Sequence, residues 1–162
     1  MATIERNDDV KIFDSLPPKE DRDVLNLSSP NILSTLEGLQ TLVVDDNEDV
    51  LFLTSIMLED YGAVVMTAPS ASEAFKIFSQ MKPDILISDL AMPGEDGYSL
   101  IRKIRNLSPE EGGLIPAIAL TASARDQDHF LSLEAGFQVH LAKPIDFEEL
   151  VRVVADLAKR SQ

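Results

Sequence analysis

Two patterns of apolar residues alternate along the chain between residues 39 and 159. Short continuous runs of apolar and β-branched residues predict strands that are buried on both faces. Between these runs, apolar residues recur at helical spacing and predict helices with one buried face. The predicted strands are 39–44, 63–67, 85–89, 115–120 and 139–142, and the predicted helices are 48–60, 70–81, 100–107, 125–134 and 147–159. This repetition predicts an α/β fold, in which right-handed crossovers join the strands of a parallel sheet.

Polar residues at the boundaries predict where helices begin. Ser70 or Ser72 is expected to open the second helix. Ser70 with Glu73, and Asp146 with Glu149, have the spacing of a capping box. Residues 108–113 are rich in proline, glycine and acids and are interpreted as a loop. The inner face of the first helix is expected to consist of Val50, Leu51, Leu53, Thr54, Met57 and Leu58.

The third predicted strand ends in a carboxylate, Asp89, and the turn residues Pro93, Gly94 and Gly97 follow it. In open α/β sheets, ligands bind at the carboxyl ends of the strands. Asp89 is therefore a candidate site residue. The alternative is that Asp89 caps the turn or the next helix, which is a common use of aspartate.

A pair of acids, Asp45 and Asp46, follows the first predicted strand. Asp46 or Asn47 could cap the next helix, which would explain one or two of the polar residues here. Adjacent acids at a strand end also raise each other's pKa, and a bound divalent cation would relieve their repulsion. The pattern by itself leaves both interpretations open.

Four strand ends together carry a consistent set of polar side chains. The first strand is followed by Asp45 and Asp46, the third ends at Asp89, the fourth is followed by Thr121 and the fifth by Lys143. All are expected at the same edge of a parallel sheet, where three carboxylates would form a pocket suited to Mg²⁺. A hydroxyl and an ammonium could bind phosphoryl oxygens, and Asp89 could form an acyl phosphate as an oxygen nucleophile.

Composition narrows the class of protein. The chain has 28 acidic and 14 basic residues and a formal net charge of -14, which argues against non-specific binding of nucleic acid. It has no cysteine, which excludes disulfides, thiolate chemistry and cysteine-ligated zinc. No apolar run reaches membrane-spanning length and the N-terminus lacks a signal-peptide core. We therefore expect a soluble, cytoplasmic protein that binds no membrane.

Residues 1–38 differ from the rest because their apolar residues show no sustained period. We interpret them as an N-terminal extension, mobile or loosely docked, on a domain that spans residues 39–162. The alternatives are a linker from a larger ancestral protein or a specific docking peptide.

The order of these residues resembles the receiver domain of two-component response regulators. The resemblance covers about residues 39 to 158 and rests on four motifs, which are Val44-Asp45-Asp46, the run from Asp89 to Gly97, Leu120-Thr121-Ala122 and Ala142-Lys143-Pro144. It implies a flavodoxin-like (CheY-like) fold: a doubly wound parallel sheet of five strands in the order 2-1-3-4-5, with five helices.

The resemblance also implies a metal-dependent phospho-acceptor. Asp89 would accept the phosphoryl group, and Asp45 and Asp46 would hold Mg²⁺ (or Mn²⁺) together with Asp89 and the backbone carbonyl of Ala91. The donor would be a phosphohistidine on a sensor histidine kinase or a histidine phosphotransfer protein. Such a domain is a signalling module rather than an enzyme, although it assists its own phosphorylation and dephosphorylation.

The same resemblance assigns Thr121 as the switch hydroxyl and Lys143 as the residue that contacts the phosphate, with a cis Lys143–Pro144 bond. Two positions depart from the common pattern. His140 stands where the family often has Tyr or Phe, which predicts a weaker or different aromatic coupling to Thr121; otherwise His140 is merely a half-buried strand residue. Ala91 cannot orient an attacking water, which predicts slow loss of the phosphoryl group.

The output of such a module is expected to be a protein contact, because no DNA-binding domain follows the last helix, or onward relay of the phosphoryl group. The downstream partner is unknown, and the chain is expected to be a monomer or a phosphorylation-dependent dimer. It could be a stand-alone regulator or a receiver derived from a hybrid kinase. A flavin-binding electron carrier and a phosphorylation-independent interaction domain are the competing functions; Asp45 and Asp46 argue against both.

Overall fold

The computed structural model describes residues 35–122 and 126–160. The predicted N-terminal extension therefore lies largely outside the described residues and stays a prediction. Residues 35–38 of the predicted extension are described. Among them, Leu36 is buried in the core, and its backbone N–H donates to the carbonyl oxygen of Tyr61.

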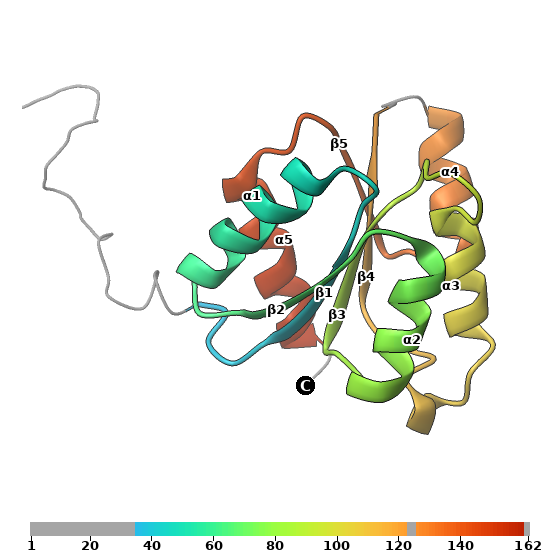
Figure 1. Cartoon of the computed structure of the whole chain (residues 1–162), viewed down its shortest axis with the longest axis horizontal. Coiled ribbons are helices and arrows are strands. Elements are labelled where there is room, and N and C mark those ends of the chain that lie inside the picture. Colours follow the sequence, from blue (N-terminus) through green and yellow to red (C-terminus); the bar gives the residue numbers. More distant parts are fainter. Residues whose placement is uncertain (1–34, 123–125, 161–162) are drawn as a thin grey trace, which may run out of the picture. The chain divides into compact units, whose positions relative to one another are not determined.

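A five-stranded parallel sheet forms the centre of the described structure, and its strand order is β2-β1-β3-β4-β5 (Figure 1). This order and the five α-helices confirm the flavodoxin-like fold expected from the sequence. The strands are β1 (Gln40–Val44), β2 (Val64–Ala68), β3 (Ile85–Asp89), β4 (Ala117–Thr121) and β5 (Val139–Ala142). The helices are α1 (Glu48–Asp60), α2 (Ala71–Met81), α3 (Gly97–Arg105), α4 (Asp126–Ala135) and α5 (Phe147–Arg160).

Helices cover both faces of the sheet, with α1 and α5 on one face and α2, α3 and α4 on the other (Figure 1). Two apolar clusters fill the layers between sheet and helices. The inner strands β1, β3 and β4 are buried along almost their whole length. Burial on both faces explains why their sequences are continuous apolar runs rather than alternating ones.

The two caps predicted from capping-box spacing are observed, whereas α3 begins at Gly97, three residues before its predicted start. Ser70 accepts the N–H of Glu73, and Asp146 accepts the N–H of Glu149 at 3.1 Å. The interpretation of residues 108–113 as a plain loop is wrong in one detail, because Pro109–Glu111 forms a 3-10 helix, η1. Ser108 and Glu111 make a capping box there, which stabilises the short turn.

The prediction for the inner face of α1 is wrong at one residue, Leu53. Leu51, Thr54 and Leu58 are buried as expected, whereas the side chain of Leu53 is 52% exposed. A helix buries only a stripe of its surface, and Leu53 falls outside the stripe that the other three define.

Among the described residues, no helix has the length and apolar character needed to cross a membrane.

Candidate functional site

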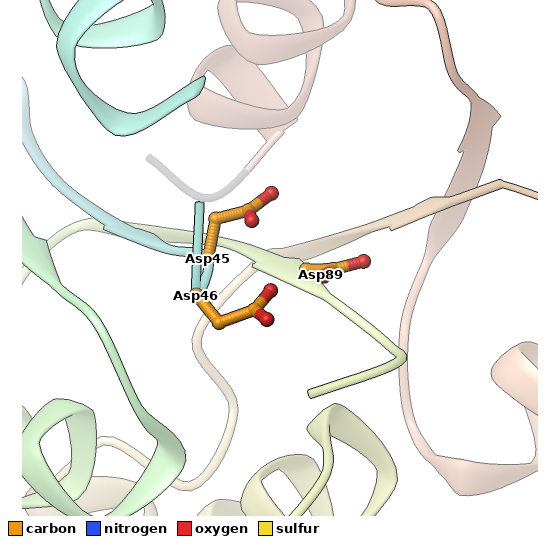
Figure 2. Close-up of side chains that lie close together, drawn as sticks. All are labelled: Asp45, Asp46 and Asp89. Atoms are coloured by element: carbon orange, nitrogen blue, oxygen red, sulfur yellow. The ribbon is translucent and has the colours of Figure 1, made fainter. Parts of the chain in front are cut away.

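The predicted site residues meet at the carboxyl edge of the sheet. Asp45 follows the last residue of β1, Asp89 ends β3, Thr121 ends β4, and Lys143 follows β5. Figure 2 shows the carboxylates of Asp45, Asp46 and Asp89 gathered at the ends of β1 and β3. Residues far apart in the sequence are thus brought together by the parallel topology.

The three acids form a compact group of oxygens. One carboxylate oxygen from each of Asp45, Asp46 and Asp89 lies within 4.8 Å of the others. Asp45 is fully buried and Asp89 is 4% exposed, while Asp46 is open to solvent. Carboxylates this close repel one another, and several hard oxygen donors facing one point are the set that a divalent cation such as Mg²⁺ prefers.

None of the three acids serves as the cap of the following helix. Asn47 caps α1 and accepts the N–H groups of Asp49 and Val50, and Asp96 caps α3. Asp45 accepts a turn N–H from Asn47 at 2.9 Å, and Asp89 accepts one from Ala91. These turn bonds orient both carboxylates, and helix capping no longer explains why acids occupy these positions.

Lys143 places its ammonium group between two of the acids. Its Nζ atom lies 2.9 Å from Asp45 Oδ2 and 3.5 Å from Asp89 Oδ1. The peptide bond that follows, Lys143–Pro144, is cis, as expected from the sequence. The lysine is thus held beside the buried acids by the last strand of the sheet.

The environment of these residues shifts two pKa values. Burial raises the pKa of Asp89, and the neighbouring charge of Asp45 raises it further, while Lys143 and the Ala91 N–H oppose the shift. Burial alone would lower the pKa of Lys143, but its hydrogen bond to Asp45 and the charges of Asp89 and Asp45 outweigh burial, so that pKa is raised. Lys143 therefore holds its proton more tightly than a free lysine does, and its charge limits the rise in the pKa of Asp89.

Gly97 allows the strand that carries Asp89 to pack against the start of α3. A Cβ atom at this position would overlap the carbonyl oxygen of Asp89 and lie 3.0 Å from the Cα atom of Leu90. The Gly97 N–H also donates to the carbonyl of Leu90 at 3.1 Å. The sequence indicated a turn here, and the structure adds that the glycine is needed for this close backbone approach.

Thr121 and His140 project from the same face of the sheet. Val139 and Leu141 pack into the cluster beneath α1 and α5, so His140 between them points to the opposite face. The alternation along β4 places Thr121 on that face too, because Ile118 and Leu120 belong to the α1–α5 cluster. His140 Nδ1 lies 3.0 Å from Ser132 Oγ of α4, a contact that the sequence did not predict.

Comparison with known proteins identifies the chain. The family model described as the response regulator receiver domain matches residues 41–155, which is most of the chain. The chain belongs to the family of response regulator receiver domains. The observed strand order and the acidic cluster at the sheet edge therefore belong to a receiver domain.

Relatives of this receiver domain include short proteins and parts of long ones. It is 46% identical over 122 residues to an uncharacterized 14.6 kDa protein of Leptolyngbya boryana, covering 75% of this chain and 92% of the relative. It is 39% identical over 144 residues to hybrid signal transduction histidine kinase D of Dictyostelium discoideum, covering 83% of this chain and only 9% of that kinase.

Solved structures agree with the fold of this receiver domain. The signal receiver domain of a signal transduction histidine kinase from Syntrophus aciditrophicus is 30% identical, with a TM-score of 0.69, covering 76% of this chain and 92% of that one. The receiver domain of Francisella response regulator 1452 is 26% identical, with a TM-score of 0.71, covering 77% of this chain and all of that one.

Proposed function

We propose that this receiver domain accepts a phosphoryl group on Asp89 from a phosphohistidine of a sensor histidine kinase or a histidine phosphotransfer protein. The single observation that carries the proposal is the convergence of Asp45, Asp46, Asp89 and Lys143 at one sheet edge. Membership of the receiver family supports the reaction class, and the receiver-bearing hybrid kinases among the relatives support a histidine kinase as donor.

In the proposed reaction, a carboxylate oxygen of Asp89 attacks the phosphorus atom of the phosphohistidine. A new O–P bond forms as the N–P bond breaks, the electron pair returns to the imidazole, and Asp89 becomes an acyl phosphate. Catalysis of such a transfer is mostly alignment and charge stabilisation. Lys143, 3.5 Å from Asp89 Oδ1, is the residue of this chain that would neutralise charge on the phosphoryl oxygens.

Asp45, Asp46 and Asp89, with the carbonyl of Ala91, are the proposed ligands of Mg²⁺ or Mn²⁺. The observed oxygens fit such an ion, because each acid offers one oxygen within 4.8 Å of the others and the raised pKa of Asp89 reflects in part repulsion by Asp45. When bound, the cation would neutralise negative charge between these acids and the incoming phosphoryl group.

Thr121 and His140 are the proposed switch residues. The phosphoryl group would draw the Thr121 hydroxyl towards Asp89, and the change would spread to β5 and α4 on the same face. This is a local change of charge that biases a two-state element. The output would be altered protein contacts, and the oligomeric state and the cytoplasmic location stay predictions.

The proposal is tested with a small acyl-phosphate donor. The native protein and Asp89→Asn are incubated with acetyl phosphate and Mg²⁺, and intact mass is measured. One added phosphoryl group is expected on the native protein and none on the variant, and EDTA should abolish the addition. Equal labelling of both proteins would show that Asp89 is not the acceptor.

A further inference from the structure

In residues 130–135 of helix α4, the buried side chain is polar rather than apolar. Among these residues, only Ser132 is buried, while Phe130, Leu131 and Leu133 are 59%, 41% and 41% exposed. A helix on a sheet normally buries its large apolar residues there. In residues 130–135 the most buried side chain is instead that of Ser132, which carries a small hydroxyl group.

The partner of that hydroxyl is His140 of β5. Ser132 Oγ lies 3.0 Å from His140 Nδ1, within ordinary hydrogen-bond distance. Across the β4–β5 ladder, His140 is paired with Ala119, whose side chain is only a methyl group. Ser132 is fully buried and cannot meet a substrate, so the pair is not a nucleophile with its base.

Two backbone bonds tie the same serine to the end of α4. The carbonyl oxygen of Ser132 accepts the N–H groups of Gly136 and Phe137, at 3.3 and 3.1 Å. The Phe137 side chain is buried in the core, and β5 begins two residues later at Val139. Ser132 thus links the helix, the turn that follows it and the ring on β5.

We propose that Ser132 is a positioning residue that holds the His140 imidazole against α4, so that β5 and α4 change together when Asp89 is phosphorylated. The relay part of this inference rests on the proposed function. Thr121 ends β4 and is paired with Ala142 across the β4–β5 ladder. Ala142 lies two residues after His140 on β5. A displacement at Thr121 would reach the ring along the β4–β5 ladder, and Ser132 would pass it to the helix.

The positioning part is tested without phosphorylation. Because one ring nitrogen is fixed by the hydroxyl, the neutral imidazole should occupy one tautomer, which ¹⁵N NMR of the ring reports. Ser132→Ala should reduce the tautomer preference of His140 roughly fivefold, the effect of losing one ordinary hydrogen bond. Ser55→Ala is the matched control, since it also deletes a helical serine hydroxyl, one that donates to the Leu51 carbonyl at 2.7 Å, and it should leave His140 unchanged. The ring ¹⁵N signals that are missing in His140→Phe are assigned to His140.

The relay part is tested with acetyl phosphate and Mg²⁺, with mass spectrometry confirming the phosphoryl group. On phosphorylation, the amide chemical shifts of residues 130–135 should change in the native protein and in Ser55→Ala. In Ser132→Ala the change should be at most about half as large. In a double-mutant cycle of Ser132→Ala and His140→Phe, the combined loss should be smaller than the sum of the two single losses, because the two side chains share one contact.

Each outcome decides a different part. An unchanged tautomer ratio in Ser132→Ala overturns the positioning role. Amide-shift changes in α4 that are as large in phosphorylated Ser132→Ala as in the phosphorylated native protein overturn the relay. A native protein that gains no phosphoryl group overturns the proposed function and the relay with it, while the tautomer ratio still decides whether Ser132 positions the ring.

Discussion

The ammonium group of Lys143 is bound more closely by Asp45 than by the proposed acceptor, with 2.9 Å from Nζ to Asp45 Oδ2 and 3.5 Å to Asp89 Oδ1. Asp45 is fully buried, so this ion pair sits where solvent screens it little. The contact leaves one oxygen of Asp45 for other bonds and keeps the ammonium within reach of Asp89. Asp45 therefore both contributes to the acidic cluster and positions the lysine.

Replacing Lys143 by methionine should slow phosphorylation of Asp89 by acetyl phosphate about 10- to 100-fold, because a charge that stabilises the transferred group is lost. The pKa of Asp89 should also rise, since Lys143 now lowers it. The rate is followed by intact-mass spectrometry across a pH series. Lys103→Met is the control: Lys103 pairs with Glu95 at 2.6 Å on the surface, and its loss should leave the rate unchanged.

Asp89→Asn should make the folded protein more stable at neutral pH. Burial and Asp45 raise the pKa of Asp89 in the folded protein, so the folded state holds this proton more tightly than the unfolded chain does. Between the two pKa values, the free energy of unfolding falls as pH rises, so the raised pKa of Asp89 costs the fold stability as pH rises towards neutrality. The gain from Asn should therefore shrink as pH is lowered through the pKa of Asp89.

Urea unfolding at several pH values measures this difference. Asp84→Asn is the contrasting variant, because Asp84 is exposed and its Oδ2 accepts the N–H of Gln40 at 2.8 Å. That variant should gain no stability at pH 7. A destabilised Asp89→Asn at neutral pH would show instead that the Asp89 carboxylate stabilises the fold.

Ala91→Asn should shorten the lifetime of the phosphoryl group on Asp89, by about tenfold, because an amide side chain can orient an attacking water and a methyl group cannot. The Ala91 side chain is exposed, and the backbone N–H that Asp89 accepts is kept in the variant. Decay of the phosphorylated mass after removal of the donor measures the lifetime. Equal lifetimes in the two proteins would contradict the role assigned to this position.

The acids of the site could be predicted from the sequence because a parallel topology places the carboxyl ends of neighbouring strands at the same edge of the sheet. Once Asp45 and Asp89 are assigned to ends of neighbouring parallel strands, the sheet itself brings them together. The register Val44↔Ser88 places the two strand ends side by side. Such positions depend on the element pattern alone and not on details of side-chain packing.

Contacts that depend on tertiary packing could not be predicted in the same way. Ser132 stands between Leu131 and Leu133, and the sequence gives no reason why the serine rather than the leucines should be buried. Leu53 is the opposite case: its apolar character predicts burial, but the packing of α1 on the sheet leaves it exposed. Hydrophobicity indicates which faces of a helix can be buried. Packing against the residues of the sheet then decides which of these faces is buried in the fold.

Thr54→Val should raise the free energy of unfolding by about 1 kcal/mol, because the Thr54 hydroxyl is fully buried in α1 and has no hydrogen-bond partner among the described residues. Valine has nearly the same shape and removes the unsatisfied group. Urea unfolding measures the change, and Thr41→Val is the matched control: Thr41 is equally buried, but its hydroxyl donates to the Leu39 carbonyl at 3.4 Å. Thr41→Val should bring no gain, and a loss of stability in Thr54→Val would show that this hydroxyl makes a favourable contact in solution.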